Sequence, residues 1–374
     1  MVPLTTLRFS IGILTLFIII FNLKTFDFNN FSHLIWPSTS YGASIYLQET
    51  DFILSKKEEK SDKIFFVGDV MLARHVETLM KREGDDYPFK NFTSLFKKNS
   101  YLVGNFEASI PIFHKPTKNN HLNFSVNKNY TEILSRYGFT HLSLANNHSY
   151  DFGLSGYKNT IFMLENQNIS VFGNPNKSEI SSVNFLNLDK SRIALVGLND
   201  TYGNLNRSDV NKLFNWINNY SDLQIVYIHW GNEYELENSN EQRNLATYLV
   251  EIGADMIVGH HPHVVQPIEI INDKLVFYSL GNFIFDQYFD TTVQTGLVLE
   301  ISKNSNNEFL IDLLPVDNST NLSQPNLMKL SQKNVFLQQL SANSNKDLKT
   351  QILNSQIILD KNLATSQKTV IMAI

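Results

Sequence analysis

The stretch Val258-Gly259-His260-His261-Pro262-His263 places three of the chain's ten histidines within four positions. The residues before it, Ala254-Asp255-Met256-Ile257-Val258, predict a buried strand that runs into a tight turn carrying the imidazoles. A neutral imidazole offers one ring nitrogen to a divalent metal while the other nitrogen hydrogen-bonds to a neighbouring group. His261 and His263 can therefore present two ligands from one turn, although a pH-sensitive or merely polar loop would show the same local pattern.

Composition limits the classes of protein that this chain can belong to. With 374 residues, 43% hydrophobic and 18% charged, it can bury a sizeable core as two or three domains or as one large α/β sandwich. The net charge of −5 and the lack of a basic block argue against a nucleic-acid partner. The absence of cysteine excludes disulfides, thiolate metal sites and a cysteine nucleophile.

An apolar run from Phe9 to Leu23 lies between Arg8 and Lys24. It is short for a membrane span, which usually needs about 20 residues, and it fits a signal peptide, an uncleaved anchor or a buried helix. Since no small-residue cleavage site follows closely, we favour an uncleaved anchor over residues 1–24, followed by a linker over 25–61. We therefore expect a single-pass protein of the cytoplasmic membrane whose main domain is extracytoplasmic.

The rest of the chain alternates between apolar strands and amphipathic helices. We predict one α/β domain over residues 62–318 and a peripheral helical tail over 319–374. Helices are expected at 157–166 and 241–252. Buried strands are expected within 63–71, 100–107, 141–146, 191–198, 222–228, 254–258, 274–283, 296–301 and 309–316.

Several of these strands end in residues that commonly bind metals. The carboxyl ends of neighbouring strands meet at one edge of an α/β sheet, so an ordered series of such ends predicts a shared site. Each residue also has a structural interpretation: Asp69 can cap a helix, Asn-Asn-His can form a turn, and His229 can be a core histidine. The series comprises Asp69, Asn105, Glu107, Asn146, Asn147, His148, His229, His261, His263 and Asn282.

The chemistry of this set favours a divalent metal centre. Nitrogen and oxygen ligands without sulfur suit Mn, Fe, Zn or Mg. There are enough of them for two ions about 3.5–4 Å apart, the arrangement that clamps the attacking and leaving oxygens in phosphoryl hydrolysis. His148 can protonate a leaving oxygen, and Asp151 either orients His148 or caps the following helix.

Taken together, the motifs resemble the CapA family. These are capsule, or poly-γ-glutamate, biosynthesis proteins of the PgsA type, related to calcineurin-like metallophosphoesterases. The resemblance covers roughly residues 62 to 302. It rests on Gly68-Asp69-Val70-Met71-Leu72, Asn105-Phe106-Glu107, Asn146-Asn147-His148-Ser149-Tyr150-Asp151-Phe152-Gly153, His229-Trp230-Gly231-Asn232-Glu233-Tyr234, Gly259-His260-His261-Pro262-His263-Val264-Val265-Gln266 and Ser279-Leu280-Gly281-Asn282-Phe283.

The resemblance implies a metallophosphatase-like four-layer αββα sandwich. It also implies as partners the ligase and small membrane subunits of a capsule polymer synthase, and poly-γ-glutamate or a related anionic polymer. By the same resemblance, His148 is the histidine that assists the leaving group, and we predict Asp151 as its partner in a catalytic pair. The implied metal ligands are Asp69, Glu107, Asn147, His229, His261 and His263. Supporting or alternative ligand positions are Asn105, Asn146, Glu233, His260 and Asn282.

Two positions depart from the phosphoesterase pattern. Met71 stands where those enzymes have a histidine, and Glu107 stands where they have a bridging aspartate. Three hypotheses follow. The chain is a capsule-polymer protein whose metal site acts on an amide or polymer-linked bond, a metallophosphoesterase with a small or lipid-linked substrate, or a non-catalytic scaffold for the synthase subunits.

Overall fold

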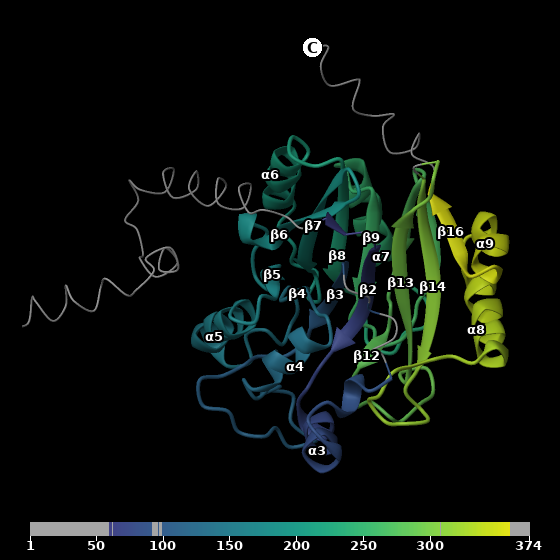
Figure 1. Cartoon of the computed structure of the whole chain (residues 1–374). Coiled ribbons are helices and arrows are strands. Elements are labelled where there is room, and N and C mark those ends of the chain that lie inside the picture. The colour runs from purple at the N-terminus through teal and green to yellow at the C-terminus, as the bar shows by residue number, and fades with distance from the viewer. Residues whose placement is uncertain (1–59, 62, 92–95, 97–98, 307, 360–374) are drawn as a thin grey trace, which may run out of the picture. The chain divides into compact units, whose positions relative to one another are not determined.

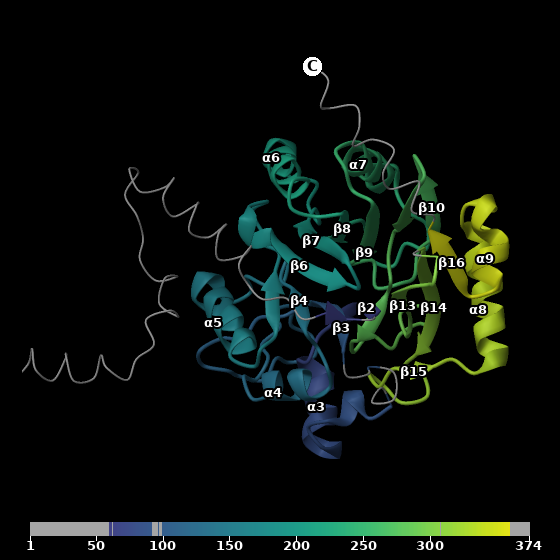
Figure 2. The ribbon, with the colours of Figure 1, turned by 45° about the horizontal axis from the view of Figure 1, so that its top comes forward.

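The computed structural model describes residues 60–61, 63–91, 96, 99–306 and 308–359, which fall within one compact unit. The expected anchor over 1–24 and all but the end of the linker lie outside these residues. Within the part that is described, no helix is both long and apolar enough to cross a membrane. Two β-sheets with helices on their outer faces make up the fold (Figures 1 and 2).

The first sheet has nine strands, and its central strands β2 to β5 run parallel. Its strand order is β15 (Asn326–Leu327), β14 (Phe309–Asp317), β13 (Thr295–Lys303), β2 (Lys63–Val70), β3 (Ser100–Phe106), β4 (His141–Ser143) and β5 (Ser170–Phe172). Two further strands join it: β12 (Asn282–Ile284) pairs with β2, and β16 (Gln356–Leu359) pairs with β14.

The second sheet has seven strands around a parallel centre formed by β7, β8, β9 and β11. Its order is β1 (Lys60–Ser61), β6 (Val183–Leu188), β7 (Ser191–Asn199), β8 (Leu223–His229), β9 (Met256–His260), β11 (Lys274–Phe277) and β10 (Ile268–Ile271). Both parallel centres are buried on both faces, which is why their strands read as continuous apolar runs.

Two hydrophobic clusters separate the layers. Phe66 and Val103 of the first sheet pack with Leu195 and Tyr227 of the second in the cluster between the sheets. The other cluster joins the first sheet to α3 (Arg74–Glu83), α4 (Tyr130–Arg136) and α5 (Gly153–Glu165). On the far side, α6 (Arg207–Ile217) and α7 (Asn240–Glu251) lie along the second sheet (Figure 2). The order of layers is therefore helices, sheet, sheet, helices.

The segment after residue 319 contains the expected helices, here α8 (Leu330–Asn343) and α9 (Lys349–Leu353). It also supplies β15 and β16, which the sequence analysis did not predict. Leu337 and Ile352 belong to the cluster between the sheets, so this segment contributes to the same core as the strands before it.

The expected strand within 274–283 was wrong as a single element. The chain forms β11 in the second sheet, leaves it after Phe277, and pairs with the first sheet from Asn282 onward as β12. The crossing uses Gly281 at φ 66, a backbone conformation that a residue with a Cβ rarely adopts. An apolar run alone does not reveal that the chain changes sheet within it.

Candidate metal centre

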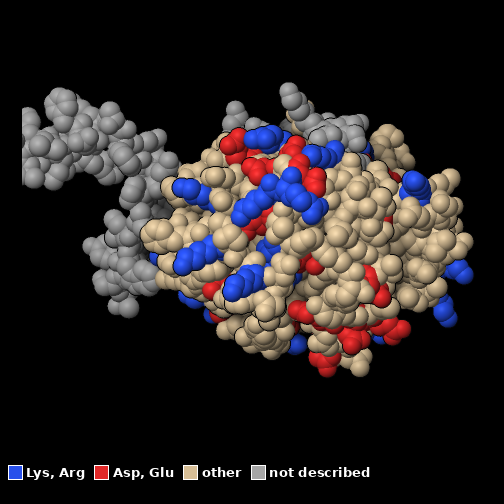
Figure 3. Space-filling view, turned by 90° about the horizontal axis from the view of Figure 1, so that it is seen from below, with Lys and Arg blue, Asp and Glu red and all other residues tan. Residues whose placement is uncertain are grey.

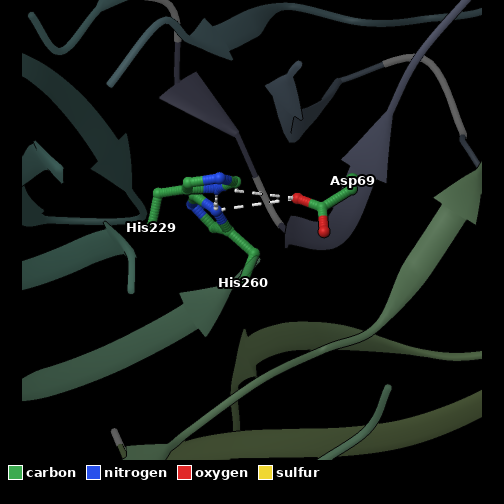
Figure 4. A group of neighbouring side chains, drawn as sticks. All are labelled: Asp69, His229 and His260. Atoms are coloured by element: carbon green, nitrogen blue, oxygen red, sulfur yellow. Dashed lines mark hydrogen bonds and ion pairs between the residues drawn. The ribbon is translucent and has the colours of Figure 1, made fainter. Parts of the chain in front are cut away.

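Strand register brings the predicted strand ends together. Asp69 on β2 is the Cα partner of Asn105 on β3, and His229 on β8 is the partner of His260 on β9. Asp69 comes from the first sheet and the two histidines come from the second. Figure 4 shows the three side chains pointing toward one another across the space between the sheets. The site thus lies where the carboxyl ends of two parallel strand sets converge.

The glycine before the histidine series permits close packing of β9 against the segment that follows β11. A Cβ at Gly259 would lie 2.1 Å from the carbonyl oxygen of Tyr278 and 2.4 Å from Nε1 of Trp230. The turn that follows holds His261 at φ 101 and His263 at φ 59, a region that few non-glycine residues adopt. The predicted tight turn is therefore present, but it begins after His260, which is the last residue of β9.

The first group of ligand-type atoms comes from Asp69, His229 and His260. All three side chains are fully buried, and one potential ligand atom from each lies within 4.8 Å of the others. The two Nδ1 atoms of the histidines are 2.7 Å apart, and Oδ1 of Asp69 lies 3.7 Å from Nδ1 of His260. His260, expected only as an alternative ligand, is a member of this group.

The second group consists of Glu107, His261 and His263, also buried and also within 4.8 Å in ligand atoms. Nε2 of His263 lies 3.8 Å from Oε1 of Glu107. Both carboxylate oxygens of Glu107, Nδ1 of His261 and Nε2 of His260 have no hydrogen-bond partner among the described residues. Buried polar atoms are rarely left so, and bound cations would satisfy them. The residues present therefore fit a divalent metal centre.

The electrostatic environment holds most of these groups in the protonation state that metal binding requires. Burial lowers the pKa of His260 to about 3 and that of His261 to about 4. Burial alone would raise the pKa of Asp69, but the hydrogen bond to His263 and the charges of His263 and His260 lower it to about 2. At neutral pH the two imidazoles are neutral and Asp69 is ionised, the forms that metal binding requires.

Glu107 differs from Asp69 in this respect. Burial raises its pKa well above the usual range, and the negative charges of Asp69 and Glu233 act in the same direction. Without a nearby cation, this carboxyl therefore favours its protonated form. A bound divalent ion would reverse that preference, because an opposite charge stabilises the carboxylate.

His148 and Asp151 form a pair beside the second group. Nδ1 of His148 lies 3.0 Å from Oδ2 of Asp151, and Nε2 lies 3.8 Å from Oε1 of Glu107. The Phe124 ring stacks on the imidazole at 4.0 Å, and the Phe124 backbone N–H donates to Oδ2 of Asp151 at 2.6 Å. Helix α5 begins after Phe152 and has no side-chain cap. Of the two roles considered for Asp151, the geometry supports orienting His148.

A chain of amides connects the first sheet's strand ends. Nδ2 of Asn105 donates to Oδ1 of Asp69 at 2.8 Å, and Oδ1 of Asn105 accepts from Nδ2 of Asn146 at 2.9 Å. Oδ1 of Asn146 in turn accepts from the backbone N–H of His148 at 3.0 Å. These two asparagines therefore connect the Asp69 carboxylate to the His148 turn.

The remaining predicted residues lie around the two ligand groups. Oδ1 of Asn147 is 2.9 Å from Nε2 of His229. Oδ1 of Asn282 is 2.9 Å from Nδ1 of His263. Glu233 is exposed, and it contributes to the site through its negative charge, which helps to raise the pKa of Glu107.

Sequence reasoning missed Arg74, whose positive charge acts to lower the pKa of Glu107. Its Nε donates to Oδ2 of Asp286 at 3.1 Å, and its guanidinium lies 4.4 Å from the centre of the Phe124 ring. The sequence feature that could have indicated Arg74 is its position only five residues after Asp69. Met71 is fully buried, and its sulfur accepts the backbone N–H of Ala73 at 3.0 Å, which gives this side chain a structural role.

Comparison with known proteins identifies the family of the chain. Residues 63–287 match the family described as "Bacterial capsule synthesis protein PGA_cap". The chain is 31% identical to "Capsule biosynthesis protein CapA" of Bacillus anthracis over 79% of this chain and 77% of that protein. It is 33% identical to "PGA biosynthesis protein CapA" of Bacillus subtilis (strain 168) over 67% and 70% of the two chains.

A 5'-nucleotidase from Candida albicans SC5314 is a structural neighbour at 13% identity and a TM-score of 0.37, covering 83% of this chain and 56% of that one. That similarity is low, whereas the family match extends over residues 63–287, which include all of the strand ends described above. The chain belongs to the family of bacterial capsule synthesis proteins.

Proposed function

We propose that this chain is a membrane-anchored, extracytoplasmic hydrolase that acts in the synthesis, export or release of poly-γ-glutamate or a related anionic capsule polymer. One observation carries the proposal. Two buried groups of ligand-type side chains lie side by side in a member of a capsule synthesis family, and four of their polar atoms have no hydrogen-bond partner within the described part of the chain.

Each group would hold one divalent ion, of Mn, Zn, Fe or Mg type. Asp69, His229 and His260 are the residues for one ion, and Glu107, His261 and His263 are those for the other. Ions bound there would polarise the bond to be cleaved and make a water molecule nucleophilic at neutral pH. The protein's own task is to keep the imidazoles neutral and the ligand atoms close together in a buried setting, as described above.

His148 is the residue that we assign to proton transfer. Asp151 holds Nδ1, so Nε2 is directed toward the second ligand group, 3.8 Å from Oε1 of Glu107. The Phe124 ring fixes the plane of the imidazole by stacking on it. A leaving nitrogen or oxygen at this position could take its proton from Nε2, a contribution of roughly 100-fold or more to the rate of such reactions.

A metallophosphoesterase with a small or lipid-linked substrate is the second candidate. It is favoured by the same pair of adjacent ligand groups, because two metals that clamp both oxygens of an in-line displacement are typical of phosphoryl hydrolysis. Assays on a polymer amide and on phosphomono- and diesters, with Mn, Zn, Fe and Mg in turn, distinguish the two candidates.

Metal content is the first test. The full chain, purified in detergent, is compared with the double variant His261→Ala/His263→Ala by mass spectrometry. The control is His141→Ala, a buried histidine outside both groups. We expect stoichiometric metal in the wild type and in the control, and its loss in the double variant. A folded wild type that takes up no Mn, Zn or Fe would contradict the proposal.

A cellular test separates catalysis from scaffolding. Loss of the gene is expected to change the amount, length or surface retention of the capsule polymer, and the wild-type chain is expected to restore it. The synthase ligase and its small membrane subunit are the partners that we expect to co-purify. If the double histidine variant assembles with them and restores the polymer fully, the hydrolase proposal is wrong and a scaffold role explains the protein.

A further inference from the structure

The segment between β3 and α4 exposes an unusual amount of apolar surface. Of its side chains, Ile112 is 62% exposed, Phe113 is 87% exposed and Leu122 is 70% exposed. His114 contacts Glu77 of α3, so the segment lies at the end of the molecule that carries this helix (Figure 1). Large exposed apolar side chains gathered in one segment are typical of an interaction surface rather than of random surface composition.

The same segment is basic within an acidic chain. No Asp or Glu occurs between Glu107 and Glu132, whereas Lys115, Lys118 and Lys128 do, in a chain with a net charge of −5. Seen from below, Lys and Arg side chains lie over the left half and the top of the face, with Asp and Glu side chains among them at the top, and a further acidic group lies at the lower right (Figure 3). Apolar tips beside lysines are the composition of segments that bind at the surface of anionic membranes.

The segment is ordered by its own hydrogen bonds. Oγ1 of Thr117 donates to the carbonyl of Asn123 and accepts the N–H of Ser125, both at 2.9 Å. At its base, His114 lies 2.8 Å from Oγ of Ser125 and 2.9 Å from Oε1 of Glu77. Because these hydrogen bonds already hold the backbone of the loop in place, binding through the loop costs little backbone conformational entropy.

We propose that residues 112–123, the β3–α4 loop, insert into the surface of a lipid bilayer that contains anionic lipids. The lysines provide charge complementarity to the head groups. A soluble anionic polymer would leave Phe113 and Leu122 in water, whereas the boundary between head groups and acyl chains would bury them. The inference concerns a surface outside the two ligand groups and does not depend on their chemistry.

Docking of this loop would place the metal centre at the lipid surface. Phe124 follows Leu122 by two residues, stacks on His148 and donates to Asp151. The loop that touches the membrane would therefore also hold the imidazole that we assign to proton transfer. A substrate that is lipid-linked or emerging from the membrane would meet the site without leaving the interface.

The absence of native cysteine allows a direct test. Asn119→Cys, at the exposed turn of the loop, is labelled with an environment-sensitive fluorophore in the full chain and mixed with vesicles of phosphatidylcholine and phosphatidylglycerol. We expect a blue shift, a several-fold rise in emission and quenching by nitroxide-labelled lipid. The same label at Asn211→Cys, exposed on α6, is the control and is expected to stay in water.

Two further variants test the chemistry of the contact. Phe113→Ser/Leu122→Ser is expected to abolish the shift of the Asn119→Cys label, and Lys115→Gln/Lys118→Gln is expected to abolish its dependence on phosphatidylglycerol. A loop label that keeps its aqueous emission while the chain sediments with the vesicles would overturn the proposal. A response to soluble polyglutamate but not to vesicles would overturn it in favour of the polymer. Neither result would alter the metal content of the protein, so the proposed function is tested separately.

Discussion

Asn282 holds the ring of His263, with its Oδ1 2.9 Å from Nδ1. The same Nδ1 lies 3.2 Å from Oδ2 of Asp69. Since both neighbours accept hydrogen bonds, we assign the ring proton to Nδ1, which leaves Nε2 free to bind a cation beside Glu107. Asn282 comes after β10 and β11 in the chain, and it thus decides which ring nitrogen of His263 is available to bind a metal.

Replacing Asn282 with Ala is therefore expected to weaken metal binding. Loss of such a supporting hydrogen bond typically costs about 10- to 100-fold in metal affinity, and we expect a loss in that range by calorimetric titration. The control is Asn318→Ala, which removes another buried asparagine side chain outside the site. Equal affinity losses in the two variants would mean that the effect is general destabilisation.

Replacement of a buried glutamate by the neutral glutamine should change the free energy of unfolding in opposite directions at Glu107 and Glu77. Glu107 has no hydrogen-bond partner for either carboxylate oxygen, whereas Oε1 of Glu77 lies 2.7 Å from Nζ of Lys81 and 2.9 Å from Nε2 of His114. At pH 8 in chelator, Glu107→Gln is expected to raise the free energy of unfolding, because burial of its charge is unfavourable. Glu77→Gln is expected to lower it.

The same Glu107→Gln variant is expected to lose metal, since an amide is a weaker ligand than a carboxylate. Urea unfolding and metal analysis on one preparation check both effects. Stabilisation without loss of metal would show that Glu107 is not a ligand, and destabilisation would show that its carboxylate has a favourable partner in the fold.

Sequence patterns predicted the central strands of both sheets, missed β1, β5, β6, β10, β15 and β16, and predicted the contacts between strands poorly. Asp69, Asn105 and His229 were recognisable because each follows an apolar run, and strand ends converge in layered α/β folds. The grouping of His260 with Asp69 was not recognisable. It depends on how the two sheets pack face to face, which no residue pattern within a single strand encodes. Phe124 also carried no signal, because a buried phenylalanine looks the same whether it fills a core or stacks on an imidazole.

The free energy of unfolding of the metal-free chain should decrease as the pH is lowered below neutrality. The folded-state pKa values of His260 and His261 are about 3 and about 4, below the ordinary value of 6.5, so the unfolded chain binds more protons below that pH. The free energy of unfolding should therefore decrease from about pH 6.5 to about pH 4. Glu107, whose pKa is raised, opposes this trend, and Asp69 adds to it only below pH 3.8.

Urea unfolding in chelator at several pH values measures this slope. The double variant His260→Gln/His261→Gln is expected to make it shallower, because glutamine does not titrate, and His229, whose pKa burial also lowers, supplies the remaining slope. His121→Gln, which replaces an exposed histidine, serves as the control and is expected to leave the slope unchanged. A wild-type slope no steeper than that of the double variant would contradict the assignment of both histidines as neutral in the folded chain.

Asp151 is expected to act through His148 rather than on the substrate. Asp151→Asn keeps the size of the side chain but removes the negative charge that holds Nδ1 protonated at 3.0 Å. We expect turnover to fall roughly 100-fold with unchanged metal content. His148→Gln should reduce turnover at least as much. Asp151→Glu, which restores the charge, should recover part of the rate. If Asp151→Asn instead lowers metal content in step with turnover, the carboxylate supports the ligand groups, and proton transfer by His148 must be assigned without it.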